Sequence, residues 1–282
     1  MKASTPPDPI LTVDVEEWFH VCGQPEYADV AAWSGMPSRV VPCVDSLLEL
    51  LDGSGSRATF FVLGWVARKC PGLVPKVVDA GHEIGCHGDL HRRIFEMSLD
   101  EFRQDVRKAK VVLEQQAGVR VTSFRAPEWS MRSADNPALA VLVEEGFRVD
   151  SSLTATPPVG DPSNSRRPAR IVTPAGSIVE VPPLTGSFFF RQAILGGGVC
   201  SRMSRLSRVE GLMRKSLDAE IPPVLYLHPW ELDEAHPPMH LSFVGNLVHF
   251  AGRARTRPRL ESLLRRYRFA PISSAEVDGA VR

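Results

Sequence analysis

The segment GHEIGCHGDLHR, residues Gly81 to Arg92, joins an apolar strand pattern to a pair of histidines. Its first half, Gly-His-Glu-Ile-Gly-Cys, has the length and glycine punctuation of a short buried strand. His87 and His91 follow where that strand ends, and histidines four apart project from one side of a helical turn. If such a turn forms, both imidazoles can bind one metal ion. Because α/β enzymes carry catalytic groups at strand ends, this segment predicts both the fold class and the position of the site.

The rest of the chain alternates strand patterns with helix patterns. We predict strands at 10–14, 57–64, 121–125, 147–152, 177–181 and 223–228, and helices at 41–51, 71–81, 98–117 and 136–145. The helix at 98–117 begins with a capping box, Ser98-Leu-Asp-Glu101. Several of the strands carry a polar or titratable residue at their carboxyl ends, as the strands of a parallel α/β barrel do. The fold class is therefore α/β.

Other segments are less regular. Residues 154–170 are rich in Pro, Ser and Arg and are predicted to leave the core, whereas 186–199 is apolar and ends in three glycines. This second segment is typical either of a mobile lid or of a buried turn. A basic helix is expected at 201–216, with its arginines facing solvent, and a last helix and strand are expected at 246–266 and 269–272.

The composition is that of an ordinary globular protein. The 282 residues are 43% hydrophobic and 23% charged, with 33 basic and 33 acidic side chains. This balance gives no overall field that would attract nucleic acid or an anionic membrane. The five cysteines are widely spaced and form no Cys-x-x-Cys pair, so we expect reduced thiols.

The sequence contains no apolar stretch long enough to span a membrane. The first 14 residues lack the apolar core of a secretory signal, so a cytoplasmic location is expected. A polysaccharide destined for export would instead favour the periplasm.

The residues at the strand ends suggest a hydrolytic site. Two imidazoles and one carboxylate make an open three-ligand set that suits a catalytic zinc ion. A second carboxylate could then take a proton from water, and a histidine on the opposite rim could protonate a leaving nitrogen. In extended geometry Asp14 and Glu16 point to one side of their strand and Glu17 to the other, although a solvated acidic loop is an open alternative.

Five motifs in order resemble the NodB-like polysaccharide deacetylases of carbohydrate esterase family four. They are Thr12-Val-Asp14-Val-Glu16, His87-Gly-Asp-Leu-His91, Arg125-Ala-Pro127, Asp150-Ser-Ser and Leu227-His228. The longer segments Asp-Val-Glu-Glu-Trp-Phe-His, Phe-Arg-Gln-Ala-Ile-Leu-Gly-Gly-Gly and Leu-His-Pro-Trp-Glu are similar to the subfamily found in exopolysaccharide loci of the exosortase type. The resemblance implies a distorted, incomplete (β/α) barrel with fewer than eight strands. It also implies a catalytic domain at 10–231 and a C-terminal extension at 232–282 packed on the same domain. Residues 1–9 carry three prolines and few apolar side chains, so a loose tail is expected there.

The resemblance also implies roles for individual residues. Asp14 would be the general base, oriented by Arg125, and Glu16 would bind a divalent metal together with His87 and His91. The metal would be zinc, with cobalt or nickel as alternatives. His228 would be the general acid, with Asp150 as its partner.

Substrate contacts follow from the same motifs. Pro127 belongs to the third motif, and the backbone N–H of Glu128 after it would help to hold the oxyanion. Trp18, Trp129 and Trp230 are candidates to stack on sugar rings, or else pack in the core. The implied reaction removes N-acetyl groups from hexosamine units of a polysaccharide or oligosaccharide and releases acetate. The number of subunits is not predicted.

The sequence departs from the family pattern in three places, one of them the fourth motif, which keeps Asp150 but lacks the usual Asp-Trp after it. The metal carboxylate is Glu16 rather than an aspartate and is displaced by one residue, and Gly88 stands where the family has a hydroxyl side chain. Three alternatives stay open: a non-haem iron oxygenase, which uses the same two-histidine, one-carboxylate set; an amidohydrolase acting on a small cyclic or linear amide; and a catalytically silent carbohydrate-binding protein.

Overall fold

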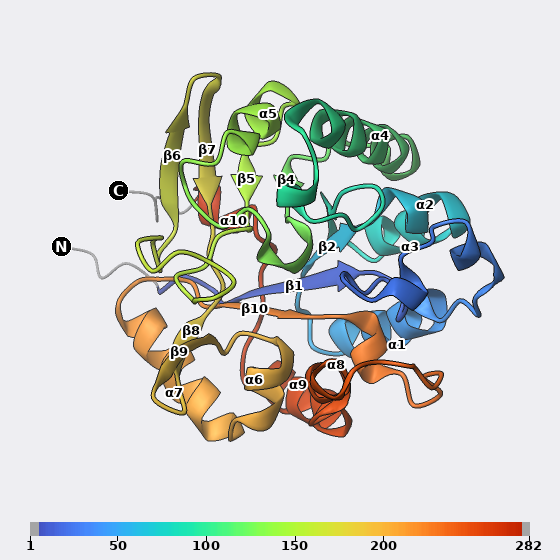
Figure 1. Cartoon of the computed structure of the whole chain (residues 1–282). Coiled ribbons are helices and arrows are strands. Elements are labelled where there is room, and N and C mark those ends of the chain that lie inside the picture. Colours follow the sequence, from blue (N-terminus) through green and yellow to red (C-terminus); the bar gives the residue numbers. More distant parts are fainter. Residues whose placement is uncertain (1–5, 278–282) are drawn as a thin grey trace.

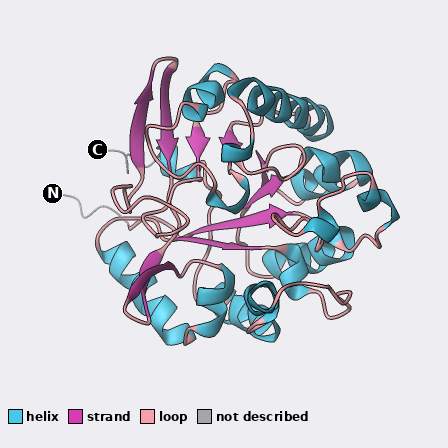
Figure 2. Cartoon of the chain, in the orientation of Figure 1, coloured by secondary structure: helices cyan, strands magenta, loops and turns pink. Residues whose placement is uncertain are grey.

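A curled eight-stranded sheet forms the centre of the molecule, for which a computed structural model describes residues 6–277 (Figures 1 and 2). Its order is β10 (Val224–Leu227), β1 (Ile10–Val15), β2 (Thr59–Val62), β3 (Glu83–Cys86), β4 (Ser123–Phe124), β5 (Val149–Asp150), β7 (Gly176–Glu180) and β6 (Ala169–Thr173). Neighbouring strands are parallel except β6 and β7. Among the described residues no pairing joins β10 to β6, so the barrel is incomplete, as predicted.

The number of strands differs from the expectation. The sheet has eight strands rather than fewer, because part of the segment predicted to leave the core folds back as β6. Thr173 pairs with Gly176 across a tight turn whose threonine hydroxyl donates to the Gly176 carbonyl at 3.1 Å. Gly176 has a φ of 132°, which only glycine adopts readily. The hairpin thus adds an antiparallel edge strand to seven parallel ones.

Helices cover the outside of the sheet (Figure 1). They are α1 (Val40–Asp52), α2 (Gly64–Lys69), α3 (Leu73–Asp79), α4 (Leu99–Ala117), α5 (Ala138–Glu144), α6 (Gly198–Met203), α7 (Leu206–Asp218), α8 (Phe243–Phe250), α9 (Thr256–Leu264) and α10 (Ser274–Val277). The capping box of α4 is present: Glu101 N–H donates to the Ser98 hydroxyl at 3.2 Å, and Ser98 N–H donates to the Glu101 carboxylate at 2.8 Å. One face of α4 is buried against the sheet, as its apolar repeat predicts.

The short helix α2 was not predicted. It begins at Gly64, directly after β2, and packs against α4. A Cβ at Gly64 would lie 2.3 Å from Asp89 Oδ1 and 2.8 Å from the Ala109 Cα. Glycine therefore permits the close approach of the two helices.

The glycine-ended segment contains a hairpin and a buried turn. The hairpin consists of β8 (Thr185–Phe188) and β9 (Arg191–Ile194), and Gly196–Gly198 then runs beside β10. Tyr226 N–H donates to the Gly196 carbonyl at 2.9 Å, and a Cβ at Gly196 would lie 2.3 Å from the Val224 carbonyl oxygen. The buried-turn interpretation is thus confirmed for the glycines, which cover the free edge of β10.

The C-terminal region differs from the prediction in detail. The predicted basic helix is two helices, α6 and α7, and the predicted last helix is also two, α8 and α9. Ala270 forms only a parallel bridge to Ile10 instead of a strand. Leu260, Leu263 and Leu264 of α9 belong to the main hydrophobic core. The boundary predicted at 231/232 stays a prediction, and most of the predicted tail lies outside the described residues.

Within residues 6–277, no helix combines the length and apolar character needed to cross a bilayer.

Candidate active site

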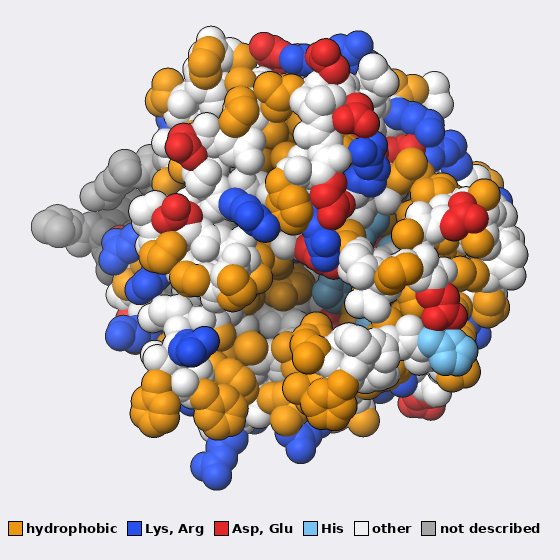
Figure 3. All heavy atoms as spheres, viewed as in Figure 1, with side chains coloured by type: hydrophobic (Ala, Val, Ile, Leu, Met, Phe, Trp, Pro, Cys, Tyr) orange, Lys and Arg blue, Asp and Glu red, His pale blue; other side chains and the backbone are white. Residues whose placement is uncertain are grey.

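The carboxyl ends of β1, β3 and β10 meet at one cavity of about 530 Å³. Asp14 and Glu16 reach it from β1, His87 and His91 from the loop after β3, and His228 from the end of β10. Glu17 points the other way and accepts hydrogen bonds from the Arg39 backbone N–H, so the predicted alternation along the strand is confirmed. Figure 3 shows a hollow near the centre of the molecule with a histidine at its base.

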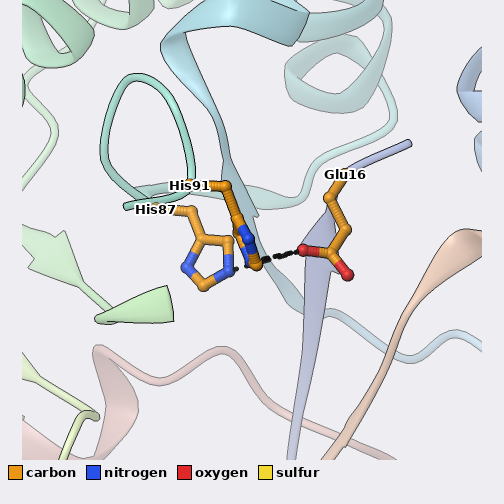
Figure 4. A group of neighbouring side chains, drawn as sticks. All are labelled: Glu16, His87 and His91. Atoms are coloured by element: carbon orange, nitrogen blue, oxygen red, sulfur yellow. Dashed lines mark ion pairs between the residues drawn. The ribbon is translucent and has the colours of Figure 1, made fainter. Parts of the chain in front are cut away.

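Glu16, His87 and His91 form a buried cluster of three potential ligand atoms within 4.8 Å of one another (Figure 4). His91 Nε2 lies 2.7 Å from Glu16 Oε2, and His87 Nε2 lies 4.0 Å from the same oxygen. Burial by itself would raise the pKa of Glu16, but the surrounding histidines outweigh it and lower the pKa well below the usual value. The carboxylate is therefore charged and available as a ligand.

Both histidines are oriented by their second ring nitrogens. His87 Nδ1 is 2.8 Å from the Arg125 carbonyl oxygen, and His91 Nδ1 is 3.4 Å from Cys22 Sγ, which leaves both Nε2 atoms facing Glu16. Burial lowers the pKa of His87 to about 4, so its ring is neutral, as a ligand must be. A tetrahedral zinc site with an open fourth position uses such an N₂O donor set. The three residues therefore fit a divalent metal ion.

The backbone that presents the two histidines is not the helical turn considered from the sequence. Residues 87–93 form a loop, and Gly88 and His91 have φ values of 81° and 54°. The left-handed conformation explains why glycine stands at position 88. The loop brings His91 to Glu16. The spacing of four therefore correctly indicated that His87 and His91 share one site, although the predicted helical turn was wrong.

Arg125 holds Asp14 from inside the barrel. Its Nη1 donates to Asp14 Oδ1 at 2.8 Å and to the Thr12 hydroxyl at 2.7 Å, and its other nitrogens donate to Ser151. The guanidinium lies 4.5 Å from the centre of the Phe61 ring and 4.8 Å from that of Trp129. Arg125 is 1% exposed and does not line the cavity, so it positions Asp14 and does not touch a substrate.

His228 faces both carboxylates of β1, and its partner is not Asp150. His228 Nε2 lies 4.0 Å from Asp14 Oδ2 and 3.6 Å from Glu16 Oε1, while its Nδ1 lies 2.8 Å from Glu231 Oε1. Burial alone would lower the pKa of His228, but the carboxylates of Glu16, Glu231 and Asp14 outweigh it and raise the pKa. Glu231 is in turn held by Arg202, whose Nη1 donates to its Oε2 at 2.8 Å.

Asp150 lies elsewhere in the core, which corrects the predicted pairing. Its carboxylate accepts from the Ser152 hydroxyl, and that hydroxyl also accepts from the Ala126 N–H at 2.8 Å. Burial raises the pKa of Asp150 to about 6, and the adjacent Glu180, also buried, has its pKa raised well above the usual value. Asp150 thus supports the loop after Arg125 and does not contact His228.

The third motif forms an unusual turn at the cavity wall. Pro127 begins a short 3₁₀ helix (Pro127–Trp129), and Glu128 and Trp129 have φ values of 51° and 57°. Such values are uncommon outside glycine and concentrate at functional sites. The turn places Glu128 on the cavity wall, whereas Pro127 is buried and does not line the cavity, and the oxyanion role of the Glu128 N–H stays a prediction. The Glu128 carboxylate points to Arg93, 2.7 Å from Nε.

The three predicted tryptophans have different surroundings. Trp129 lines the cavity, but Trp18 does not: it packs in an aromatic cluster with Phe19 and Tyr27 and donates to the Pro37 carbonyl at 2.9 Å. Trp18 is therefore a packing residue, which corrects its predicted contact with substrate. Trp230 borders the cavity with neither face free, because its ring stacks between those of His228 and His249.

Trp230 instead supports the metal site. Its indole N–H donates to Glu16 Oε1 at 3.1 Å, so the ring fixes one oxygen of the carboxylate while the other faces the histidines. The prediction that Trp230 stacks on a sugar ring is therefore wrong, and Trp230 instead positions Glu16. The physical reason is that a flat ring with both faces covered has only its edge available.

Several residues at the site were not predicted. Glu231 and Arg202 orient His228, Tyr226 packs edge-on against Trp129 in the cavity wall, and His20 lies beside His91. Glu231 had a sequence signal, because the Leu-His-Pro-Trp-Glu segment places a carboxylate three residues after the histidine. Arg202 had none, since an arginine in a basic helix is normally solvated.

Comparison with known proteins agrees with this geometry. A polysaccharide deacetylase family model matches residues 35–149, and a model described as a domain of unknown function, DUF3473, matches residues 151–276. The chain is 33% identical over 81 residues to the peptidoglycan-N-acetylglucosamine deacetylase of Bacillus cereus, covering 29% of this chain and 30% of that protein. It is also 33% identical over 93 residues to the deacetylase PgdA of Listeria monocytogenes, covering 33% and 19%. The matches thus span under a third of these relatives' lengths.

Solved structures show the same fold. A putative polysaccharide deacetylase from Mycobacterium smegmatis superimposes with a TM-score of 0.60 at 22% identity, over 98% of this chain and 92% of that one. A mutant of BA3943, described as a carbohydrate esterase family 4 pseudoenzyme with restored enzymatic activity, has a TM-score of 0.52 at 14% identity, over 94% and 66%. Residues 35–149 thus match the polysaccharide deacetylase family, residues 151–276 match the domain of unknown function DUF3473, and the chain shares the fold of these polysaccharide deacetylase structures.

Proposed function

We propose that this chain hydrolyses the N-acetyl groups of hexosamine units in a polysaccharide and releases acetate, with a divalent metal ion bound by Glu16, His87 and His91. One observation carries the proposal. A carboxylate held by an arginine and a histidine held by a carboxylate both face this three-residue cluster in a single cavity. A base and an acid flanking a metal site are the groups that amide hydrolysis requires.

Asp14 is suited to accept a proton. Its Oδ1 is occupied by Arg125, so Oδ2 is the oxygen left to face the cavity and His228. Because Arg125 fixes the direction of the carboxylate, Asp14 can act as a base toward a water molecule without reorienting. The metal would contribute Lewis-acid polarisation of the acetyl group and of water. The mixed nitrogen and oxygen ligands favour zinc.

His228 is suited to donate a proton. Glu231 holds its Nδ1, so Nε2 faces the cavity and would carry the proton to the leaving amine. The carboxylates of Glu16, Glu231 and Asp14 outweigh burial and raise the pKa of His228, which favours the charged ring that a proton donor needs. The backbone N–H of Glu128 would donate to the oxyanion. His228 and Glu231 belong to the domain of unknown function, which on this proposal completes the active site rather than forming an accessory unit.

The substrate class is inferred from the relatives named above together with the cavity. The polysaccharide is proposed to be one made for export, on the resemblance to deacetylases of exopolysaccharide loci. Apart from Glu128 and Arg202, the cavity wall around the candidate catalytic and metal-binding residues consists mostly of uncharged side chains such as Trp129 and Tyr226, as suits an uncharged sugar.

An acetate-release assay on N-acetylglucosamine oligomers tests the proposal. Asp14→Asn should lower kcat by about 10²–10⁴-fold because it removes the base, and His87→Ala should lose both activity and bound metal, measured by elemental analysis. His240→Ala is the matched control, because that side chain is 87% exposed, forms an ion pair with Glu26 and does not line the cavity. Equal activity in all four proteins would contradict the mechanism.

Two outcomes would favour other functions. Activity on a small cyclic amide with none on the oligomers would identify a small-amide hydrolase. Tight binding of the oligomers without acetate release, in protein shown to contain metal, would identify a silent binding protein. The complete base, acid and metal cluster argues against the second outcome.

A further inference from the structure

The β8–β9 hairpin ends in two phenylalanines that project from the protein. Phe188 pairs with Arg191, so Phe189 and Phe190 are the two residues of the loop. Their φ values are 45° and 66°, and their exposed fractions are 80% and 104%. Two-residue loops with positive φ favour Asn-Gly, and bulky side chains there are strained. Since little of either ring is covered by the described residues, intramolecular packing does not explain this choice, and strain of this kind often marks function.

Apolar surface continues from this tip to the cavity. Helix α6 packs against both β9 and α8 and so connects them. Seven of the twelve large apolar side chains that are exposed among the described residues lie on these elements. This set, the apolar rim, is Phe189, Phe190, Met203, Phe243, Val244, Leu247 and Val248. Val248 also lines the cavity, and Figure 3 shows hydrophobic side chains gathered along the lower side of the hollow. The rim therefore borders the entrance to the candidate active site.

The segments that form the rim carry only positive charge. Residues 181–209 contain four arginines and no Asp or Glu, and residues 235–260 likewise contain four arginines and no Asp or Glu. In a chain with 33 acidic residues, such acid-free runs leave the rim segments without a carboxylate of their own, although Arg202 is buried and paired with Glu231. Arg191, Arg205 and Arg208 are exposed, and Arg208 donates to the Ser187 carbonyl of the hairpin at 2.6 Å. Arginines thus surround the phenylalanine tip.

We propose that the apolar rim docks this protein on an anionic membrane surface, so that the cavity opens toward the bilayer. A protruding, fully exposed aromatic tip suits insertion into the soft interfacial layer better than docking into a matching protein pocket. Exposed apolar side chains ringed by arginines are the combination that binds acidic lipid headgroups. The acid-free segments remove the repulsion that an anionic surface would otherwise exert.

Vesicle co-sedimentation of the full chain tests this proposal. The vesicles are phosphatidylcholine alone and phosphatidylcholine mixed with phosphatidylglycerol. The variants are Phe189→Ser combined with Phe190→Ser, Arg205→Glu combined with Arg208→Glu, and the control Val172→Ser. Val172 is 82% exposed on β6 and is not part of the rim, so its variant controls for the loss of an exposed apolar side chain.

We expect binding to the mixed vesicles that weakens as salt is raised. The double phenylalanine variant should lose at least about tenfold in partition coefficient, because two apolar side chains no longer leave water. The double arginine variant should lose binding to the anionic vesicles, and Val172→Ser should bind like the wild type. Asp14→Asn should also bind normally, which separates this proposal from the proposed catalysis.

Three results would overturn the proposal: no binding to either vesicle, equal loss in the phenylalanine and Val172 variants, or a concentration-dependent dimer without vesicles that the phenylalanine variant abolishes. The last result would assign the rim to a second copy of the chain.

Discussion

Replacing Glu231 with Gln should lower the pKa of His228 and move the alkaline limb of the activity profile to lower pH. The substitution keeps a hydrogen-bond acceptor near His228 Nδ1 but removes the negative charge that now lies 2.8 Å away. As the proposed general acid, His228 must be protonated to act, so activity should be lost as pH rises through its pKa. Because the carboxylate raises that pKa, its removal must shift the loss of activity downward.

The size of the shift follows from the contact. A hydrogen bond to a charged group contributes about 1.5–3 kcal/mol, and one pKa unit corresponds to about 1.36 kcal/mol. The alkaline limb of kcat/KM should therefore move by about 1–2 pH units. A bound metal would affect the pKa of His228 equally in wild type and variant. The difference between their alkaline limbs therefore measures the contribution of the Glu231 charge.

The assay is the pH dependence of kcat/KM for acetate release, with Asp150→Asn measured in parallel. Asp150 has no contact with His228, so its variant should keep the alkaline limb in place even if it is less stable. The reasoning is refuted if Asp150→Asn shifts the limb and Glu231→Gln does not. Because Arg202 loses its partner in Glu231→Gln, folding is checked by near-ultraviolet circular dichroism, and the position of the limb does not depend on the amount of folded enzyme.

Four further outcomes are expected. Burial raises the pKa values of Asp150 and Glu180 above those of the unfolded chain, so the pair stabilises the fold most below about pH 4 and loses this contribution as pH rises. Glu180→Gln should therefore raise Tm at pH 8 and not at pH 4. An equal change in Tm at both pH values would contradict this explanation. Gly64→Ala should cost about 1–3 kcal/mol in a denaturant titration, because its Cβ would lie 2.8 Å from the Ala109 Cα; a stability equal to wild type would refute that packing argument. Trp129→Phe should raise KM, whereas Trp18→Phe should leave KM unchanged and lower Tm. A raised KM in Trp18→Phe with an unchanged KM in Trp129→Phe would show that Trp18 contacts the substrate. Chelation should abolish acetate release and zinc should restore it, whereas full activity in metal-free protein would exclude the metal role.

Sequence reasoning located the strands and the residues at their ends. Asp14, Glu16, His87, His91 and His228 were all named from local patterns, and the structure brings them to one cavity. Alternating strands and helices leave few parallel arrangements, and parallel strands bring their carboxyl ends to one side. Apolar periodicity and capping residues are local signals, which is why α4 was predicted together with its capping box.

The partners of these residues could not be predicted in the same way. The contact between His228 and Glu231 depends on a short 3₁₀ helix, Pro229–Leu232, that turns a sequence neighbour back onto the ring. Arg202 reaches Glu231 from a helix 29 residues earlier in the chain, and Trp230 is sandwiched by rings from two elements. Such contacts are set by packing, and no periodicity records them.

The sequence by itself determined the fold class and the chemical groups of the site, because both depend on local spacing and residue type. Only the tertiary structure decided which carboxylate holds His228, which tryptophan faces the cavity, and that His91 reaches Glu16 through a left-handed loop. The charge balance of the chain is neutral, yet folding places its acid-free segments and exposed phenylalanines together beside the cavity. Composition sums over the whole chain, whereas a surface depends on which distant segments become neighbours.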